Sequence, residues 1–146
     1  MKVEESPIII EQVIERPSSL IWKVITELEH MRKWFFDNIP DFEAKVGFKT
    51  SFNISTGQRN FKHLWEIIEV VPGRLIKYNW KYEGFSGNSN VEFNLTDLGL
   101  KTSIRIEVII LEDFPDSIPE FTLESCKTGW EYFLQLSLKN YVDNHL

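Results

Sequence analysis

The stretch "SCKTGWEYFLQLSLKNYV", residues 125–142, decides the fold of this chain. Its apolar residues recur at helical spacing, so we expect a helix from about Glu120 to Asn144, roughly 37 Å long at about 1.5 Å per residue. A helix with so broad an apolar stripe must pack against another layer of the protein. The stripe consists of Leu123, Cys126, Trp130, Phe133, Leu134, Leu138 and Tyr141.

Gly129 lies inside this predicted helix, where a glycine costs roughly 1 kcal/mol relative to alanine. We interpret it as a point where the helix backbone closely approaches the backbone of a strand. The next residue, Trp130, points about 100° away around the helix axis. It would fill the space where helix and sheet diverge, and a ligand would sit where that space stays open.

Residues 47–111 predict five strands, because apolar and polar residues alternate in short segments separated by turn sequences such as Pro72-Gly73. Short connections between successive strands indicate antiparallel neighbours. We assign Phe61, His63, Trp65 and Ile67 to the buried face of one strand. A shift of one residue would instead turn Leu64, Glu66 and Ile68 inward.

The N-terminal part adds one strand and two helices. The β-branched run "IIIEQVIE" at 8–15 is typical of a strand. Ser18 or Ser19 can cap a helix that follows "RP", and a second short helical piece is expected near 30–36. The order β-α-α-β5-α predicts an α+β fold, in which a curved, antiparallel six-stranded sheet grips the long C-terminal helix. We expect a single domain over residues 1–146.

Composition limits the functions that the chain can have. A net charge of −6 argues against nucleic acid as a partner. Cys126 is the only cysteine, so neither an intrachain disulfide nor a cysteine-based metal site is expected. The sequence has no secretory signal and no apolar run long enough for a membrane span. We therefore expect a cytoplasmic protein with no membrane span, no metal and no cofactor.

Several segments, in this order, resemble the START-like (SRPBCC, helix-grip) superfamily over about residues 8–143. They are "PSSLIWKVIT" (17–26), "WF" (34–35), "GFKTSF" (47–52), "EVVPGRLIKYNW" (69–80), the strand from Thr102 and "GWEYFLQLSLKNYV" (129–142). The nearest branch is the family named for homology to the activator of the Hsp90 ATPase. The resemblance implies a helix-grip fold. It leaves the function open, because the superfamily includes lipid carriers, hormone receptors, cyclases and co-chaperone-like domains.

Catalytic residues are not predicted. A nucleophile needs an adjacent base, and no nucleophile elbow or phosphate-binding loop is present. The three histidines are far apart in sequence, and only His63 lies on an apolar-alternating strand face. Glu66 and Glu69 are three residues apart on a strand, so they point to opposite faces and cannot act as a carboxylate pair.

The candidate site is an aromatic cluster between sheet and helix. Either these rings fill the core, or they line a mostly apolar cavity in which the tyrosine, histidine and indole groups offer hydrogen bonds. In the second interpretation Tyr78 and His63 would bind polar groups, and Phe114 would stand at the entrance. The candidate ligand-binding residues are Trp34, Phe35, Phe52, His63, Trp65, Tyr78, Trp80, Phe93, Phe114, Trp130 and Phe133.

These observations favour non-catalytic binding of a small hydrophobic molecule, such as a lipid, a polyketide or another aromatic compound. One alternative is a cyclase- or dehydratase-like enzyme that uses a polar cavity residue, for which His63 is the candidate. Another is a co-chaperone-like interaction module. We do not expect a chaperone partner, because single-domain members of the family generally lack the separate chaperone-binding domain. The oligomeric state does not follow from the sequence.

Overall fold

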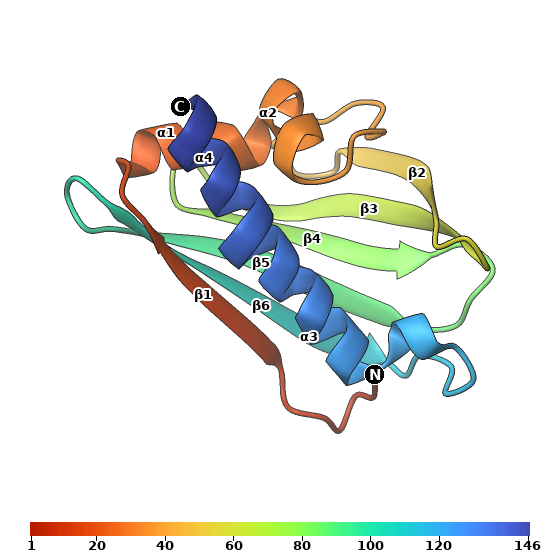
Figure 1. Cartoon of the computed structure of the whole chain (residues 1–146). Helices are drawn as coiled ribbons and strands as arrows, with labels where there is room; N and C mark the ends of the chain where they lie inside the picture. The colour runs from red at the N-terminus through yellow and green to blue at the C-terminus, as the bar shows by residue number, and fades with distance from the viewer.

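The computed structural model describes residues 1–146 and has the predicted order of elements (Figure 1). A first strand and two short helices are followed by five strands and a long C-terminal helix. The strands are β1 (Ile8–Ile14), β2 (Lys49–Ser55), β3 (Asn60–Val71), β4 (Leu75–Tyr82), β5 (Asn88–Asp97) and β6 (Thr102–Glu112). The helices between β1 and β2 are α1 (Ser18–Thr26) and α2 (Leu28–Trp34), and a 3-10 turn at Pro119–Phe121 precedes α3 (Leu123–Glu131).

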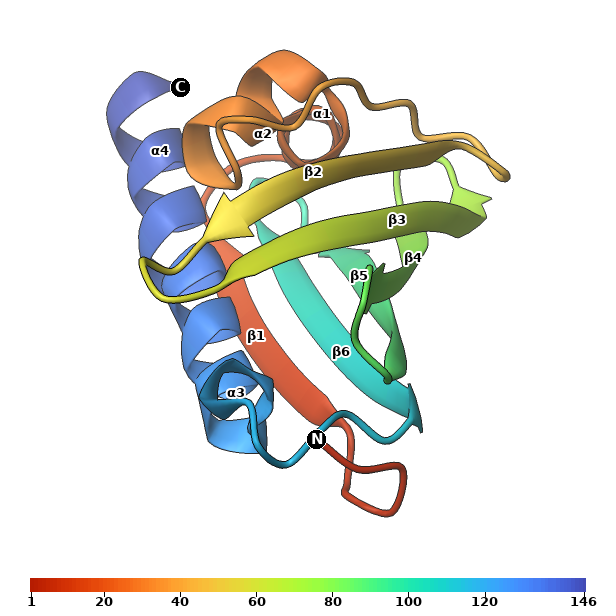
Figure 2. The same ribbon diagram turned by 90° about the vertical axis from the view of Figure 1, so that its right-hand side faces the viewer.

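All six strands form one antiparallel sheet in the order β1-β6-β5-β4-β3-β2. The sheet curls strongly, and the C-terminal helix lies across its concave side (Figure 2). The predicted inward face of β3 is confirmed: Phe61, His63, Trp65 and Ile67 are all buried. Opposite His63 on β4 lies Tyr82, so these two side chains share the inner face of the sheet.

The C-terminal helix is continuous from α3 through a π-helical segment, Tyr132–Leu138, into α4 (Lys139–His145) (Figure 1). Its buried residues recur at every fourth position: Trp130, Leu134, Leu138 and Val142. In a pure α-helix a four-residue repeat drifts by about 40° per step around the axis. The wider turns of the π segment rotate less per residue, and this keeps the repeat facing the sheet.

Our interpretation of Gly129 is wrong. A Cβ atom placed on Gly129 would meet no atom within 4 Å, so the helix does not touch the strand backbone there. The absence of a side chain leaves open space instead. Its neighbour Trp130 does point into the interior, with 6% of its surface exposed.

The first residues of the chain pack against the segment that follows β6. The amide of Phe114 donates to the Met1 carbonyl at 2.9 Å, and the amide of Val3 donates to Asp113 Oδ1 at 2.7 Å. The Met1 ammonium donates to the Phe121 carbonyl at 2.6 Å. Met1 thereby lies beside the start of the C-terminal helix. None of the helices has the length and apolar character needed to cross a bilayer.

Candidate ligand-binding site

Much of the predicted aromatic cluster is packed core. Trp34 is 1% exposed, stacks on Phe35 with ring centroids 4.5 Å apart, and donates its indole N–H to the Val24 carbonyl at 2.8 Å. Trp65 is buried, and its indole nitrogen has no hydrogen-bond partner. Six of the predicted site residues line neither of the pockets found beneath the C-terminal helix: Trp34, Phe35, Phe52, Trp65, Tyr78 and Phe93.

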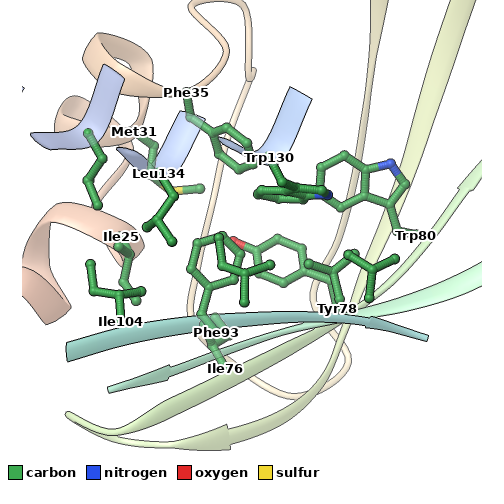
Figure 3. Close-up of a cluster of buried hydrophobic side chains, with 14 of the residues drawn as sticks. Ile25, Met31, Phe35, Ile76, Tyr78, Trp80, Phe93, Ile104, Trp130 and Leu134 are labelled. Atoms are coloured by element: carbon green, nitrogen blue, oxygen red, sulfur yellow. The ribbon is translucent and has the colours of Figure 1, made fainter. Parts of the chain in front are cut away.

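The other five predicted residues gather where α3 begins to diverge from the sheet. Figure 3 shows Trp130 of α3 beside Trp80 of β4, with Tyr78 and Phe93 nearer the sheet. The Trp80 and Trp130 ring centroids are 5.4 Å apart. Beyond them, on the side of Gly129, the packing is incomplete.

Two adjoining pockets occupy this end of the interior. The larger has a volume of about 130 Å³ and is lined by Met1, Phe36, His63, Trp80, Tyr82, Glu120, Cys126, Gly129, Trp130 and Phe133. The smaller, of about 40 Å³, is lined by Met1, Trp80, Tyr82, Ser89, Val91, Val108, Phe114, Cys126 and Trp130. Five residues belong to both pockets, so we treat the two as one site.

The predicted residues that line this site are therefore His63, Trp80, Phe114, Trp130 and Phe133. Sequence reasoning missed Phe36, Tyr82, Cys126 and Met1. Tyr82 continues the alternation of Tyr78 and Trp80, so the sequence pattern was sufficient to include it among the candidate residues. Cys126 was placed on the apolar stripe of the helix but not in the site. No sequence pattern pointed to Met1.

A larger hollow of about 380 Å³ lies on the outer face of the sheet, across β2, β3 and β4. Only Leu64 and Trp65 among its lining residues are apolar, and the others include two lysines, Lys49 and Lys81. This surface is shallow and polar. The pocket beneath α3 is the better candidate, because most of its lining residues are apolar or aromatic and a few polar groups lie among them.

His63 presents an unpaired hydrogen-bond acceptor to the pocket. Its Nδ1 lies 3.1 Å from the Phe61 carbonyl oxygen. A carbonyl only accepts, so Nδ1 must carry the proton and Nε2 is left as the acceptor. Nε2 makes no hydrogen bond to the protein and is not fully buried, so water or a ligand can reach it from the pocket that His63 lines. Burial lowers the pKa of His63 to about 4 despite the opposing hydrogen bond to Phe61, so the imidazole is neutral near pH 7.

Tyr82 presents an unpaired donor in the same place. The Trp80 indole N–H donates to the Tyr82 hydroxyl oxygen at 3.0 Å, which leaves the hydroxyl proton of Tyr82 free. Burial raises the pKa of Tyr82 well above its usual range. The ring centroids of Tyr82 and His63 are 4.8 Å apart at an interplanar angle of 85°, and no hydrogen bond joins them.

Cys126 adds a thiol to the wall of both pockets. Burial raises the pKa of this thiol to about 12, so it stays protonated near pH 7. Cys126 makes no hydrogen bond to His63, so the pair does not form an activated nucleophile. No three histidine, cysteine or acidic side chains come together as metal ligands.

A polar contact joins the β2–β3 hairpin to the turn before α3, at one side of the larger pocket. Glu120 accepts a hydrogen bond from the Thr56 hydroxyl at 2.8 Å, and Arg59 Nη1 lies 3.2 Å from its carboxylate. The Thr56 hydrogen bond is the main cause that holds the pKa of Glu120 below its usual range. Glu120 also lines the larger pocket, so this contact forms part of the pocket wall.

A curved antiparallel sheet that holds one long helix, with a pocket between them, defines the helix-grip class of α+β proteins. The sequence matches the profile of the family described as Activator of Hsp90 ATPase homolog 1-like protein over residues 15–143. The chain belongs to this family. No curated protein sequence matches it.

Solved structures confirm the fold. The crystal structure of protein CV1439 from Chromobacterium violaceum has a TM-score of 0.77 at 20% identity, covering 94% of this chain and 96% of that chain. The Aha1 dimer from Colwellia psychrerythraea has a TM-score of 0.74 at 19% identity, covering 96% of this chain and 98% of that chain.

A third structure, DynU16, is described as a putative protein in the dynemicin biosynthetic locus. It has a TM-score of 0.77 at 17% identity. The match covers 96% of this chain and 48% of that chain, so the present chain spans about half the length of DynU16.

Proposed function

We propose that this protein binds a small, largely apolar molecule in the pocket between the sheet and the C-terminal helix, without catalysis. The observation that carries the proposal is the combination of an aromatic wall with the unpaired Nε2 of His63. The aromatic wall offers apolar contacts to a ligand, and Nε2, which makes no hydrogen bond to the protein, can accept one from it.

The pocket volume sets the size of the ligand. Its larger part, about 130 Å³, is close to an engineered cavity of about 150 Å³ that binds benzene. Sites for drug-sized ligands usually have about 300 Å³ or more. A single aromatic ring therefore suits the volume of this pocket. A lipid or a polyketide would have to displace Met1 and the turn that carries Glu120.

The relatives give this proposal further support. A protein of the same fold, DynU16, belongs to the dynemicin biosynthetic locus, a setting in which small molecules are made. The enzyme alternative has less support, because the structure offers His63 as a single polar group with no nucleophile or second acid beside it.

Tryptophan fluorescence tests the proposal, since Trp80 and Trp130 both line the pocket. The protein is titrated with single-ring compounds, flavonoids, fatty acids and sterols. We expect saturable quenching by single-ring compounds. A Cys126→Phe variant should abolish this response, because the added ring fills the pocket.

The matched control is Leu136→Phe, which adds a ring to the exposed side of the same helix, where Leu136 is 52% exposed. It should bind like the unchanged protein. A flat response across the panel, or an equal response in Cys126→Phe, would contradict the proposal.

A further inference from the structure

The polar atoms of the pocket form a complementary pair. His63 Nε2 can only accept a hydrogen bond, and the Tyr82 hydroxyl has a proton to donate. The two residues lie opposite each other on β3 and β4, and their rings are 4.8 Å apart. One small group that both donates and accepts can therefore contact both residues. Hydroxyl groups have this property.

The charges around the pocket disfavour a ligand anion. No lining residue is a cation other than the Met1 ammonium, which already donates to the Phe121 carbonyl. Arg59, near the entrance, is paired with Glu120. A carboxylate bound here would lose its hydration, and the only counter-charge is the Met1 ammonium, which Glu5 already approaches to 3.9 Å.

A cationic ligand is also disfavoured, although aromatic faces attract cations. The only carboxylate that lines the pocket, Glu120, is held at the entrance by Thr56 and Arg59. An ammonium group has no acceptor function, so it would leave the Tyr82 proton without a partner.

We propose that the pocket selects a neutral single-ring molecule that carries a hydroxyl group, a phenol or a benzyl alcohol, with the hydroxyl between His63 Nε2 and the Tyr82 hydroxyl. The aromatic ring of the ligand would lie among Trp80, Trp130 and Phe133. This inference rests on the proposed function and adds the chemical class of the ligand to it.

The test compares four ligands that share one ring and differ in one group: p-cresol, toluene, benzoate and benzylammonium. Dissociation constants are measured at pH 7 from tryptophan fluorescence and from amide chemical shifts. We expect p-cresol to bind about tenfold more tightly than toluene, because two hydrogen bonds together contribute about 1–2 kcal/mol. Benzoate and benzylammonium should bind more weakly than p-cresol.

Two conservative variants locate this selectivity. Tyr82→Phe removes the donor and keeps the ring, so the preference for p-cresol over toluene should fall to about threefold or less. Tyr78→Phe is the matched control, because Tyr78 is buried on the same strand but does not line the pocket. It should keep the full preference.

The outcomes separate this inference from the proposed function. Equal binding of p-cresol and toluene, blocked by Cys126→Phe, would overturn the hydroxyl selectivity while ligand binding stands. Tightest binding of benzoate or benzylammonium, or an undiminished preference in Tyr82→Phe, would overturn it as well. If no compound binds, the proposed function fails, and this inference fails with it.

Discussion

Arg59 and Glu120 join the tip of the β2–β3 hairpin to the turn before the C-terminal helix, with 3.2 Å between Arg59 Nη1 and the carboxylate. Both side chains are partly buried but remain in contact with water, and ion pairs of this kind contribute little to stability. Glu120→Gln should therefore leave the melting temperature nearly unchanged while loosening the entrance. We expect faster hydrogen exchange in residues 56–59 and 119–121. Glu83→Gln, which breaks the Lys62–Glu83 pair elsewhere on the sheet, is the control and should leave exchange at both segments unaltered.

Gly129→Ala should stabilise the protein by about 0.5–1 kcal/mol, since the new methyl group meets no atom and alanine favours the helix. The same methyl group narrows the pocket, so ligand affinity should fall. Urea unfolding and fluorescence titration measure the two effects. In contrast, Gly87→Ala should be destabilising, because Gly87 has φ +115° and a Cβ would lie 2.5 Å from the Phe114 ring. A loss of stability in Gly129→Ala would argue that the space is closed in solution.

His63 should make stability depend on pH in a defined window. Its pKa is about 4 in the folded protein against 6.5 ordinarily, so between these values the unfolded chain binds a proton that the folded chain does not. The free energy of unfolding should fall as pH drops from about 6.5 to about 4, by about 3 kcal/mol in total.

Urea unfolding of the unchanged protein and of His63→Gln between pH 7 and pH 4.5 isolates this contribution. The other titratable side chains that line the pocket, Glu120, Tyr82 and Cys126, are present in both proteins, so most of their effect cancels in the difference. Parallel pH profiles for the two proteins would show that His63 is not buried in its neutral form.

Cys126 should react slowly with thiol reagents. A pKa of about 12 instead of 9.0 lowers the thiolate fraction about a thousandfold at a given pH below 9. Modification by a disulfide reagent at pH 8 should therefore be slow in the folded protein and fast in urea, and p-cresol should slow it further. A folded-state rate equal to the rate in urea would place Cys126 at the surface.

Substitutions of Trp34 and of Trp80 should have different effects on protein stability and on ligand affinity. Trp34→Phe removes the donor to the buried Val24 carbonyl, so it should destabilise the protein by about 1–3 kcal/mol and leave ligand affinity unchanged. Trp80→Phe changes a pocket wall and removes the hydrogen bond to Tyr82, so ligand affinity should fall. Thermal unfolding with ligand titration of both variants checks this. Equal binding losses would mean that the packed core also participates in the site.

The fold could be predicted because alternation and helical spacing each specify which face of an element is buried. The inward face of β3 and the final helix followed directly from these periods. The position of the pocket could not be predicted from these periods. Periodicity places Trp65 and Trp80 on the same inner face, but it does not say at which end of the sheet the helix diverges.

Gly129 shows most clearly what local sequence patterns cannot predict. A glycine in a helix fits a close approach of two backbones and equally fits an empty space, and only the three-dimensional arrangement distinguishes them. Met1 reaches the pocket through contacts with Phe114 and Phe121, residues more than a hundred positions away in the chain. Local sequence patterns carry no signal for such a contact.

The π-helical segment at Tyr132–Leu138 lies in the middle of the continuous C-terminal helix. The residues around its start line the pocket, and the residues from its end onward pack into the core. Before it, Trp130 faces the pocket. Within and after it, Leu138 and Val142 anchor the rod, and the Ser137 hydroxyl donates to the Trp34 carbonyl at 2.6 Å. Because these anchors lie away from the pocket, we expect substitutions at the lining positions Trp130 and Phe133 to leave the packing of Leu138 and Val142 intact.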